Sequence, residues 1–182
     1  PDKILFFEPD TSSIMGSLSD FQTITNAQGK RDANQALVPH AYDLVTDLPN
    51  SPIPTLDRIR LIMERLRSLS ARLNMPVILG EWGAYPGDRR SEAQFIVNEL
   101  ESWLAGDTYW IYGPDLSKTS HIPMLNRPYP IAVSNKISKY HFDPDTQVFT
   151  CEWEETKYAK ESSRFYIPER FYPQGIIIET SP

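Results

Sequence analysis

The segment from Thr55 to Asn74 constrains the fold most strongly, because its apolar residues recur at three- and four-residue steps. This spacing places them on one face of an α-helix. We expect the helix to end near Asn74, since Pro76 disfavours helical backbone in the residue before it. The apolar positions are Leu56, Ile59, Ile62, Met63, Leu66, Leu69 and Leu73.

A largely apolar run, PVILGEWG (76–83), follows this helix directly. Such a run without alternation is typical of a strand that is covered on both faces. A second helix is expected to start at Ser91, where SEAQ has capping-box spacing, and to end before Gly106. Further strand candidates lie at 4–7, 36–43 and 107–113.

This alternation of strands and helices predicts βα units around a parallel sheet, and thus an α/β fold. We favour a (β/α)₈ barrel, in which active-site residues lie at the carboxyl ends of the strands. A barrel of this kind needs eight strands and about 250 residues. Only four strand candidates fit before residue 115. We therefore expect residues 1–118 to form the second half of a barrel.

The character of the sequence changes after Asn126. Two strand-like runs, 137–142 and 147–153, are joined by the turn-forming tetrapeptide Asp143–Thr146. The segment 164–182 offers two more short strands, and no helical stripe appears. We expect a linker over 119–126 and a small antiparallel β-sandwich domain over 127–182.

Composition excludes several classes of function. A net charge of −6 argues against a nucleic-acid partner, because a phosphate backbone requires a basic face. No run of about 18 apolar residues exists that could span a bilayer. The single cysteine, Cys151, excludes an internal disulfide and a cysteine-based metal cluster. The aromatic share of 12% fits either core packing or stacking platforms for sugar rings.

Polar residues suited to chemistry stand at the expected strand ends. Glu81 follows an apolar run, and its glycine neighbours would allow a ligand to approach closely. A carboxylate placed there is costly unless it is functional or paired with a core arginine. His40 and Tyr42 point to one face of the preceding strand, where they could orient a glutamate. The fourth strand ends with Trp110 and Tyr112.

These motifs resemble glycoside hydrolase family 5. VILGEWG is similar to the family's nucleophile strand, PHAYD to its sixth strand and TYWIYG to its eighth. The resemblance implies that Glu81 is the nucleophile, that His40 and Tyr42 support it, and that Trp110 is the platform of a sugar subsite. On this basis we also expect Tyr112, Trp82 and Glu8 to contact substrate.

The tail, with its R-P-Y-P segment and F-D-P turn, resembles that of the endoglycoceramidase-related members. The resemblance implies retaining hydrolysis of a glycolipid by double displacement, without metal or organic cofactor. A lipid would need an apolar groove, to which the loop 14–21 and Trp82 could contribute, and contact with a membrane surface. Members are often secreted or membrane-associated. A β-glucan or mannan hydrolase and a non-catalytic carbohydrate-binding protein remain as alternatives.

Glu8 ends the first strand, ILFFEPD, in a position that invites the role of acid catalyst. Only one strand candidate lies between Glu8 and Glu81, which makes this strand the fifth of the barrel, whereas the family's acid/base residue stands on the fourth. Phe7 also replaces the asparagine that precedes that residue in the family. We therefore expect Glu8 to line the cleft or to form a structural hydrogen bond. The proton donor and the first half of the barrel are expected upstream of Pro1.

Overall fold

The computed structural model divides into two compact units, Pro1–His121 and Ile122–Pro182. Each unit is described by itself. The residues that the structure describes are 3–10, 12, 18–43, 55–85, 88–156, 158 and 162–180.

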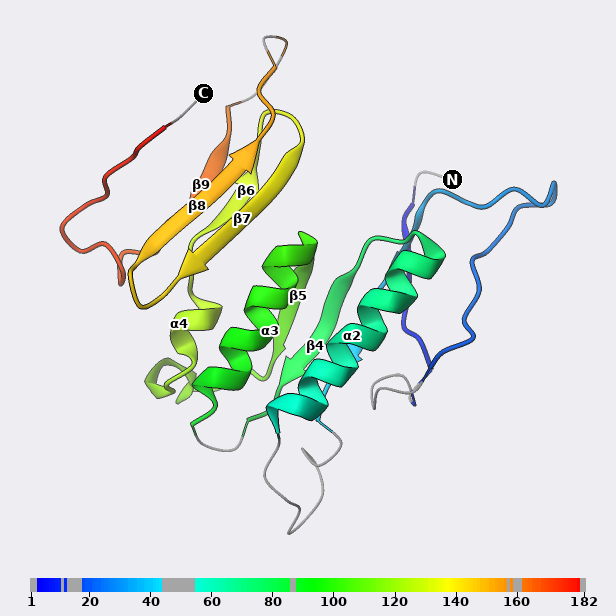
Figure 1. Ribbon diagram of the computed structural model, residues 1–182, viewed down its shortest axis with the longest axis horizontal. Helices are drawn as coiled ribbons and strands as arrows, with labels where there is room; N and C mark the ends of the chain where they lie inside the picture. The colour runs from blue at the N-terminus through cyan, green and yellow to red at the C-terminus, as the bar shows by residue number, and fades with distance from the viewer. Residues whose placement is uncertain are drawn as a thin grey trace. The chain divides into compact units, whose positions relative to one another are not determined.

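Parallel strands form the centre of the first unit. Strand β1 (Leu5–Phe7) pairs with β2 (Gln35–Leu37), and β4 (Ile78–Gly83) lies between β3 (His40–Ala41) and β5 (Gly106–Trp110). A bridge between Leu37 and Val77 links β2 to the start of β4. Figure 1 shows helices α2 (Leu56–Leu73) and α3 (Arg90–Trp103) side by side against β4 and β5. The α/β class predicted from the sequence is confirmed.

The strand predicted over 36–43 is two strands in the structure. Val38 donates its backbone N–H to Phe7, while Pro39 accepts a hydrogen bond from the backbone N–H of Gly80. Proline has no N–H to donate, so the pairing is interrupted there. As a result β2 pairs with β1, whereas β3 pairs with β4.

Helix α2 has the predicted ends. The side chain of Thr55 accepts a hydrogen bond from the backbone N–H of Arg58, which caps the first turn. Asn74 closes the helix in the left-handed conformation, with φ 48° and ψ 49°, before Met75 and Pro76. The buried side chains are the predicted apolar stripe except for Leu56, which is half-buried: Ile59, Ile62, Met63, Leu66, Leu69 and Leu73.

Helix α3 starts one residue before the predicted position and ends before Gly106, as expected, but neither predicted cap forms. The helix begins at Arg90, and Ser91 donates its hydroxyl to the neighbouring Glu92 instead of capping the first turn. Leu104, rather than a glycine, takes the left-handed C-cap position, with φ 57°. Gly106 is already the first residue of β5. Packing of the αβ connection, and not glycine's conformational freedom, therefore sets this end.

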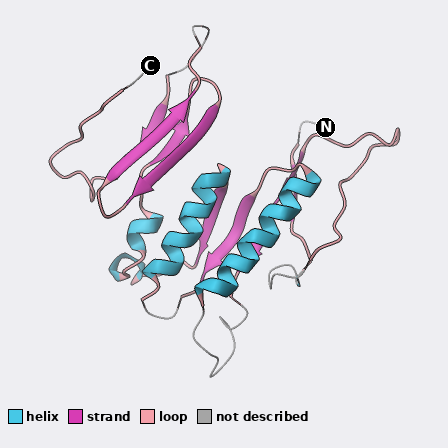
Figure 2. Cartoon of the chain, viewed as in Figure 1, coloured by secondary structure: helices cyan, strands magenta, loops and turns pink. Residues whose placement is uncertain are grey.

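The second unit consists of short antiparallel pairs (Figure 2). Strand β7 (Ile137–Asp143) pairs with β8 (Val148–Trp153), as predicted, and the Asp143 carboxylate accepts the backbone N–H of Asp145 in the turn. Strand β6 (Tyr129–Ala132) pairs with β9 (Arg164–Tyr166). Within the described part of 164–180, β9 is the only strand, so the second strand predicted there is absent.

Short helical segments occupy the region between the expected domains. A 3₁₀ turn, η1 (Leu116–Lys118), ends the first unit and α4 (Ile122–Leu125) begins the second. Helix α4 falls within the stretch expected to be a linker. None of the described helices is both long and apolar enough to cross a membrane.

Candidate active site

Glu81 lies near the carboxyl end of β4, where three of the predicted residues meet. The parallel register pairs His40 with Glu81 directly. Tyr42 donates its hydroxyl to Glu81 Oε2 at 2.8 Å, and His40 Nδ1 lies 3.5 Å from the same oxygen. Both contacts are thus made to the same carboxylate oxygen of Glu81.

Glu8 joins this group from the end of β1. Its Oε1 lies 3.3 Å from His40 Nδ1, so the imidazole stands between two carboxylates. The exposed fractions of the side chains are 49% for Glu8, 34% for Glu81 and 21% for His40. Glu8, His40, Tyr42 and Glu81 are called the Glu81 cluster below. Of the two roles expected for Glu8, the contact with His40 fits the structural hydrogen bond.

Gly80 makes room for the imidazole. A Cβ at this position would lie 2.5 Å from Val38 Cγ1 and 3.2–3.3 Å from Cδ2 and Nε2 of His40. The ring therefore rests with its Cδ2–Nε2 edge against β4, and its Nδ1 is directed to the two carboxylates. The glycine that the sequence suggested for ligand approach instead accommodates a side chain of the site.

Trp110 and Tyr112 stand at and beyond the end of β5. The side chain of Trp110 is exposed, and its register partner on β4 is Gly83. Tyr112 is 85% exposed. Both aromatic rings are thus accessible to a ligand, which their predicted contact with substrate requires.

Trp82 does not contact substrate, contrary to the prediction. Its side chain is fully buried, and its indole N–H donates to Asp107 at 2.9 Å. Successive residues of a strand point to opposite faces, so the orientation that brings Glu81 to His40 turns Trp82 into the interior. The groove-forming role expected of Trp82 is excluded for the same reason. Half of the loop 14–21, its expected partner in that role, lies outside the described residues, namely 14–17.

Aromatic residues and a histidine surround Trp82 in a group that the sequence analysis missed. Tyr109 contacts Trp82 edge-on at 5.1 Å between ring centroids, and its hydroxyl lies 2.8 Å from His121 Nε2. Tyr85 packs against both Trp82 and His121. Trp82, Tyr85, Tyr109 and His121 are called the Trp82 cluster below. No sequence motif indicates that His121 belongs to this group, because its contacts depend on the path of the chain after β5.

Burial keeps the Trp82 cluster uncharged. Desolvation raises the pKa of Tyr85, with a smaller contribution from the negative charge of Glu92. Desolvation also raises the pKa of Tyr109 and lowers that of His121, although the Asp88 carboxylate partly opposes the shift of His121. Each shift favours the neutral form. The cluster is therefore suited to packing and not to proton transfer.

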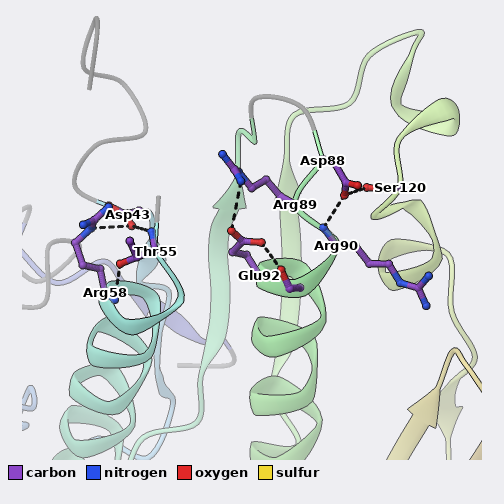
Figure 3. Close-up of polar contacts among 9 residues, drawn as sticks. Asp43, Thr55, Arg58, Asp88, Arg89, Arg90, Glu92 and Ser120 are labelled. Atoms are coloured by element: carbon purple, nitrogen blue, oxygen red, sulfur yellow. Dashed lines mark hydrogen bonds and ion pairs between the residues drawn. The ribbon is translucent and has the colours of Figure 1, made fainter. Parts of the chain in front are cut away.

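Other carboxylates at this end of the strands hold the helices in place (Figure 3). Asp43, which the sequence marked as a polar strand-end residue, is buried and accepts hydrogen bonds from Arg58 Nε at 2.8 Å and from the backbone N–H of Thr55 at 2.9 Å. These contacts connect the end of β3 to the start of α2. Asp43 is thus a structural residue.

Asp88 plays a similar part before α3. Its carboxylate accepts hydrogen bonds from the Ser120 hydroxyl and from the backbone N–H of Arg90. The hydrogen bond from Ser120, followed by that from Arg90, lowers the pKa of Asp88. In the described residues, no group of three histidine, cysteine or acidic side chains could hold a metal ion.

Comparisons with known proteins agree with this architecture. The family model "Glycoside hydrolase family 5 C-terminal domain" matches residues 127–182. A search of curated proteins finds no match.

Among solved structures, endo-glycoceramidase II from Rhodococcus sp. is similar in several complexes. Its ganglioside GM3 complex aligns with a TM-score of 0.71 and 22% identity, over 93% of this chain and 41% of that chain. Its lactosyl-enzyme intermediate aligns with a TM-score of 0.69 and 22% identity, over 93% and 40%. The chain thus spans about two fifths of the length of these structures. Residues 127–182 match the glycoside hydrolase family 5 C-terminal domain, and the chain is similar in fold to about two fifths of endo-glycoceramidase II, in agreement with the resemblance noted in the sequence.

Proposed function

We propose that this chain is part of a retaining β-glycoside hydrolase in which Glu81 is the nucleophile. The observation that carries the proposal is the convergence of Tyr42 and His40 on one oxygen of Glu81 at the carboxyl end of a parallel strand. Contacts from Tyr42 and His40 at Oε2 would hold the carboxylate in one orientation and leave Oε1 for the attack. A nucleophile needs such positioning, because attack requires the reacting atoms to be aligned at close range.

The reaction that follows is a double displacement. Glu81 Oε1 attacks the anomeric carbon while a carboxylic acid protonates the leaving oxygen, and a covalent glycosyl-enzyme forms. Water then hydrolyses this ester with the second carboxylate acting as base. Trp110 and Tyr112 are the proposed contacts for the sugar, because their rings are accessible at and beyond the end of β5.

Neither of the other strand-end carboxylates described above suits the role of proton donor. Glu8 Oε1 lies 3.3 Å from His40 Nδ1, so we propose that its carboxylate is engaged by the imidazole and does not protonate the leaving group. Asp43 is buried against Arg58. We propose that the donor belongs to polypeptide beyond this chain.

The same polypeptide would complete a (β/α)₈ barrel of which the first unit is the second half. Apolar side chains on and beside β1 are exposed in the first unit, and additional strands would bury them: Ile4, Leu5 and Phe6. In this proposal residues 127–182 form a β-sandwich domain that follows the barrel, after a linker over 119–126.

A glycolipid is the proposed substrate class. The support is the match of residues 127–182 to the family 5 C-terminal domain, together with the likeness to a protein solved as a ganglioside complex and as a lactosyl-enzyme intermediate. A glycolipid lies in a membrane, so the enzyme would contact a membrane surface during catalysis.

Hydrolysis assays on the polypeptide as the cell produces it test this proposal. We expect release of the glycan from glucosylceramide or from a longer glycosphingolipid in detergent micelles, and no cleavage of soluble β-glucan or mannan. Cleavage of the polysaccharide alone would replace the glycolipid by a polysaccharide substrate. Binding of a glycan without cleavage of any substrate would indicate a carbohydrate-binding protein and contradict the enzymatic role.

A further inference from the structure

One ring nitrogen faces two carboxylates in the Glu81 cluster. His40 Nδ1 lies 3.3 Å from Glu8 Oε1 and 3.5 Å from Glu81 Oε2. A ring nitrogen carries a single proton, so both carboxylates compete for one hydrogen-bond donor. Glu8 is the closer acceptor.

The ring is held in this orientation from two directions. Gly80 receives its Cδ2–Nε2 edge, and the ring of Tyr42 meets it edge-on at 6.2 Å between centroids, with an interplanar angle of 88°. The Nδ1 edge therefore stays directed at the two carboxylates. A small tilt is enough to move its hydrogen bond from one to the other.

Glu81 keeps a donor when His40 turns away. The Tyr42 hydroxyl binds the same Oε2 at 2.8 Å, a shorter contact than that of His40. His40 can thus direct its hydrogen bond to Glu8 while Glu81 Oε2 keeps the hydrogen bond from Tyr42. The two donors of Glu81 are therefore not equivalent, and His40 is the one with an alternative acceptor.

We propose that Glu8 is a positioning residue that shares the Nδ1–H of His40 with Glu81 while Glu81 is a free carboxylate, takes this hydrogen bond alone while Glu81 is esterified, and shares it again when the carboxylate is regenerated. This role rests on the proposed function, because it concerns the two steps of that reaction. Glu8 itself contacts neither the sugar nor the leaving group.

The charge on Glu81 changes in a way that would drive this exchange. When Oε1 bonds to the anomeric carbon, the bond to the leaving oxygen breaks and the charge of Glu81 disappears. The ester oxygen is then a weaker acceptor than the Glu8 carboxylate, so Nδ1–H shifts to Glu8. When water bonds to the anomeric carbon, the ester bond breaks and its electron pair returns to Glu81. At Glu8 and His40 only a hydrogen bond moves.

A neutral residue in place of Glu8 would affect the two steps unequally. His40 would donate to Glu81 throughout and would stabilise its free carboxylate relative to the ester. Formation of the glycosyl-enzyme would then slow about tenfold, the usual scale of one hydrogen bond to a charged group. Breakdown of the glycosyl-enzyme would not be slowed, because the charge that reappears on Glu81 would keep the hydrogen bond from His40.

Imidazole NMR of Glu8→Gln tests the contact without reference to activity. The chain has three histidines, so the ring of His40 can be assigned in the ¹⁵N-labelled polypeptide by its loss in His40→Asn. We expect the Nδ1 and attached-proton resonances to shift in Glu8→Gln and to stay unchanged in Glu64→Gln, whose exposed glutamate on α2 serves as a matched control. Unchanged His40 resonances in Glu8→Gln would overturn the proposal.

Kinetics with aryl glycosides test the role. With a poor leaving group, where ester formation limits turnover, we expect kcat of Glu8→Gln to fall about tenfold at constant KM. With a good leaving group, where ester breakdown limits turnover, kcat should equal or exceed that of the wild type, and Glu8→Asp should recover part of the loss seen with the poor leaving group. An equal fall of kcat for both substrates, or a rise in KM alone with the poor leaving group, would overturn the proposal.

A wild type that cleaves no glycoside would instead refute the proposed function and with it this role, while the resonance shift would still report the contact.

Discussion

The Glu81 cluster and the Trp82 cluster begin at neighbouring residues of one strand and have opposite properties. Glu81 turns to one face of β4, where it meets His40 and remains one-third exposed. Trp82 turns to the other face and is fully buried. One step of strand alternation thus separates a group that is open to a ligand from a group that is closed to it.

The two clusters also differ in charge: the first contains carboxylates, and the second favours neutral side chains. The Glu81 cluster holds two carboxylates around one imidazole. In the Trp82 cluster, burial raises the pKa of both tyrosines and lowers that of His121, which favours neutral side chains. We therefore expect changes in the first cluster to alter catalysis and changes in the second to alter stability.

The sharpest test of this division is Glu81→Gln. Loss of the proposed nucleophile should lower kcat by about 10³-fold or more, because the amide of glutamine cannot form the glycosyl-enzyme. The free energy of unfolding should stay within about 0.5 kcal/mol of the wild type, since the side chain is partly exposed. Steady-state assays and urea denaturation measure the two quantities. A large loss of stability would contradict the assignment of Glu81 to function.

Trp82→Ala should give the reverse result. Removing a fully buried tryptophan should lower the free energy of unfolding by about 3–5 kcal/mol, because it leaves a cavity against Tyr109 and removes the indole N–H that donates to Asp107. The folded fraction should retain its KM. Tyr112→Ala is the matched control, because that ring is exposed and its removal should cost little stability. Unchanged stability of Trp82→Ala would break the comparison.

Tyr42→Phe probes the edge of the Glu81 cluster. The substitution keeps the ring beside His40 but removes the hydroxyl that binds Glu81 Oε2 at 2.8 Å. We expect kcat to fall about tenfold, the scale of one hydrogen bond to a charged group, with little change in the free energy of unfolding. A full-rate Tyr42→Phe enzyme would show that this contact does not position the nucleophile.

The smallest expected effect is the pH dependence that His121 contributes to stability. Its pKa is lowered in the folded state, so the unfolded chain binds a proton more readily as the pH falls through about 6.5. Stability from this residue is present above that pH and declines below it. Urea unfolding at pH 8 and pH 5.5 should show a smaller decline in His121→Gln than in the wild type. An equal decline would mean that His121 is not held neutral.

Periodicity was sufficient to predict much of the fold and part of the site. The apolar stripe and Pro76 predicted both ends of α2. Alternation on the strand 36–43 placed His40 and Tyr42 on one face, and the structure brings both to Glu81. These features depend on spacing along the chain, which the sequence displays directly.

The contacts that the sequence could not predict are those between side chains of different strands. Trp82 looked like a substrate contact because it follows Glu81, yet strand pairing turns it inward. The Glu8–His40 contact requires the alignment of β1 with β3, and the hydrogen bond from Tyr109 to His121 requires the return of the chain after β5. In α3, Ser91 donates its hydroxyl to the neighbouring Glu92, a choice of partner that the capping-box spacing does not reveal.

The most direct test of the central claim is to trap the glycosyl-enzyme. The polypeptide as the cell produces it is incubated with a 2-deoxy-2-fluoro glycoside, digested with a protease, and its labelled peptide is sequenced by mass spectrometry. The account predicts a single added glycosyl group on the peptide that contains Glu81, and none in Glu81→Gln. A label on any other carboxylate, Glu8 included, would contradict the assignment of the nucleophile.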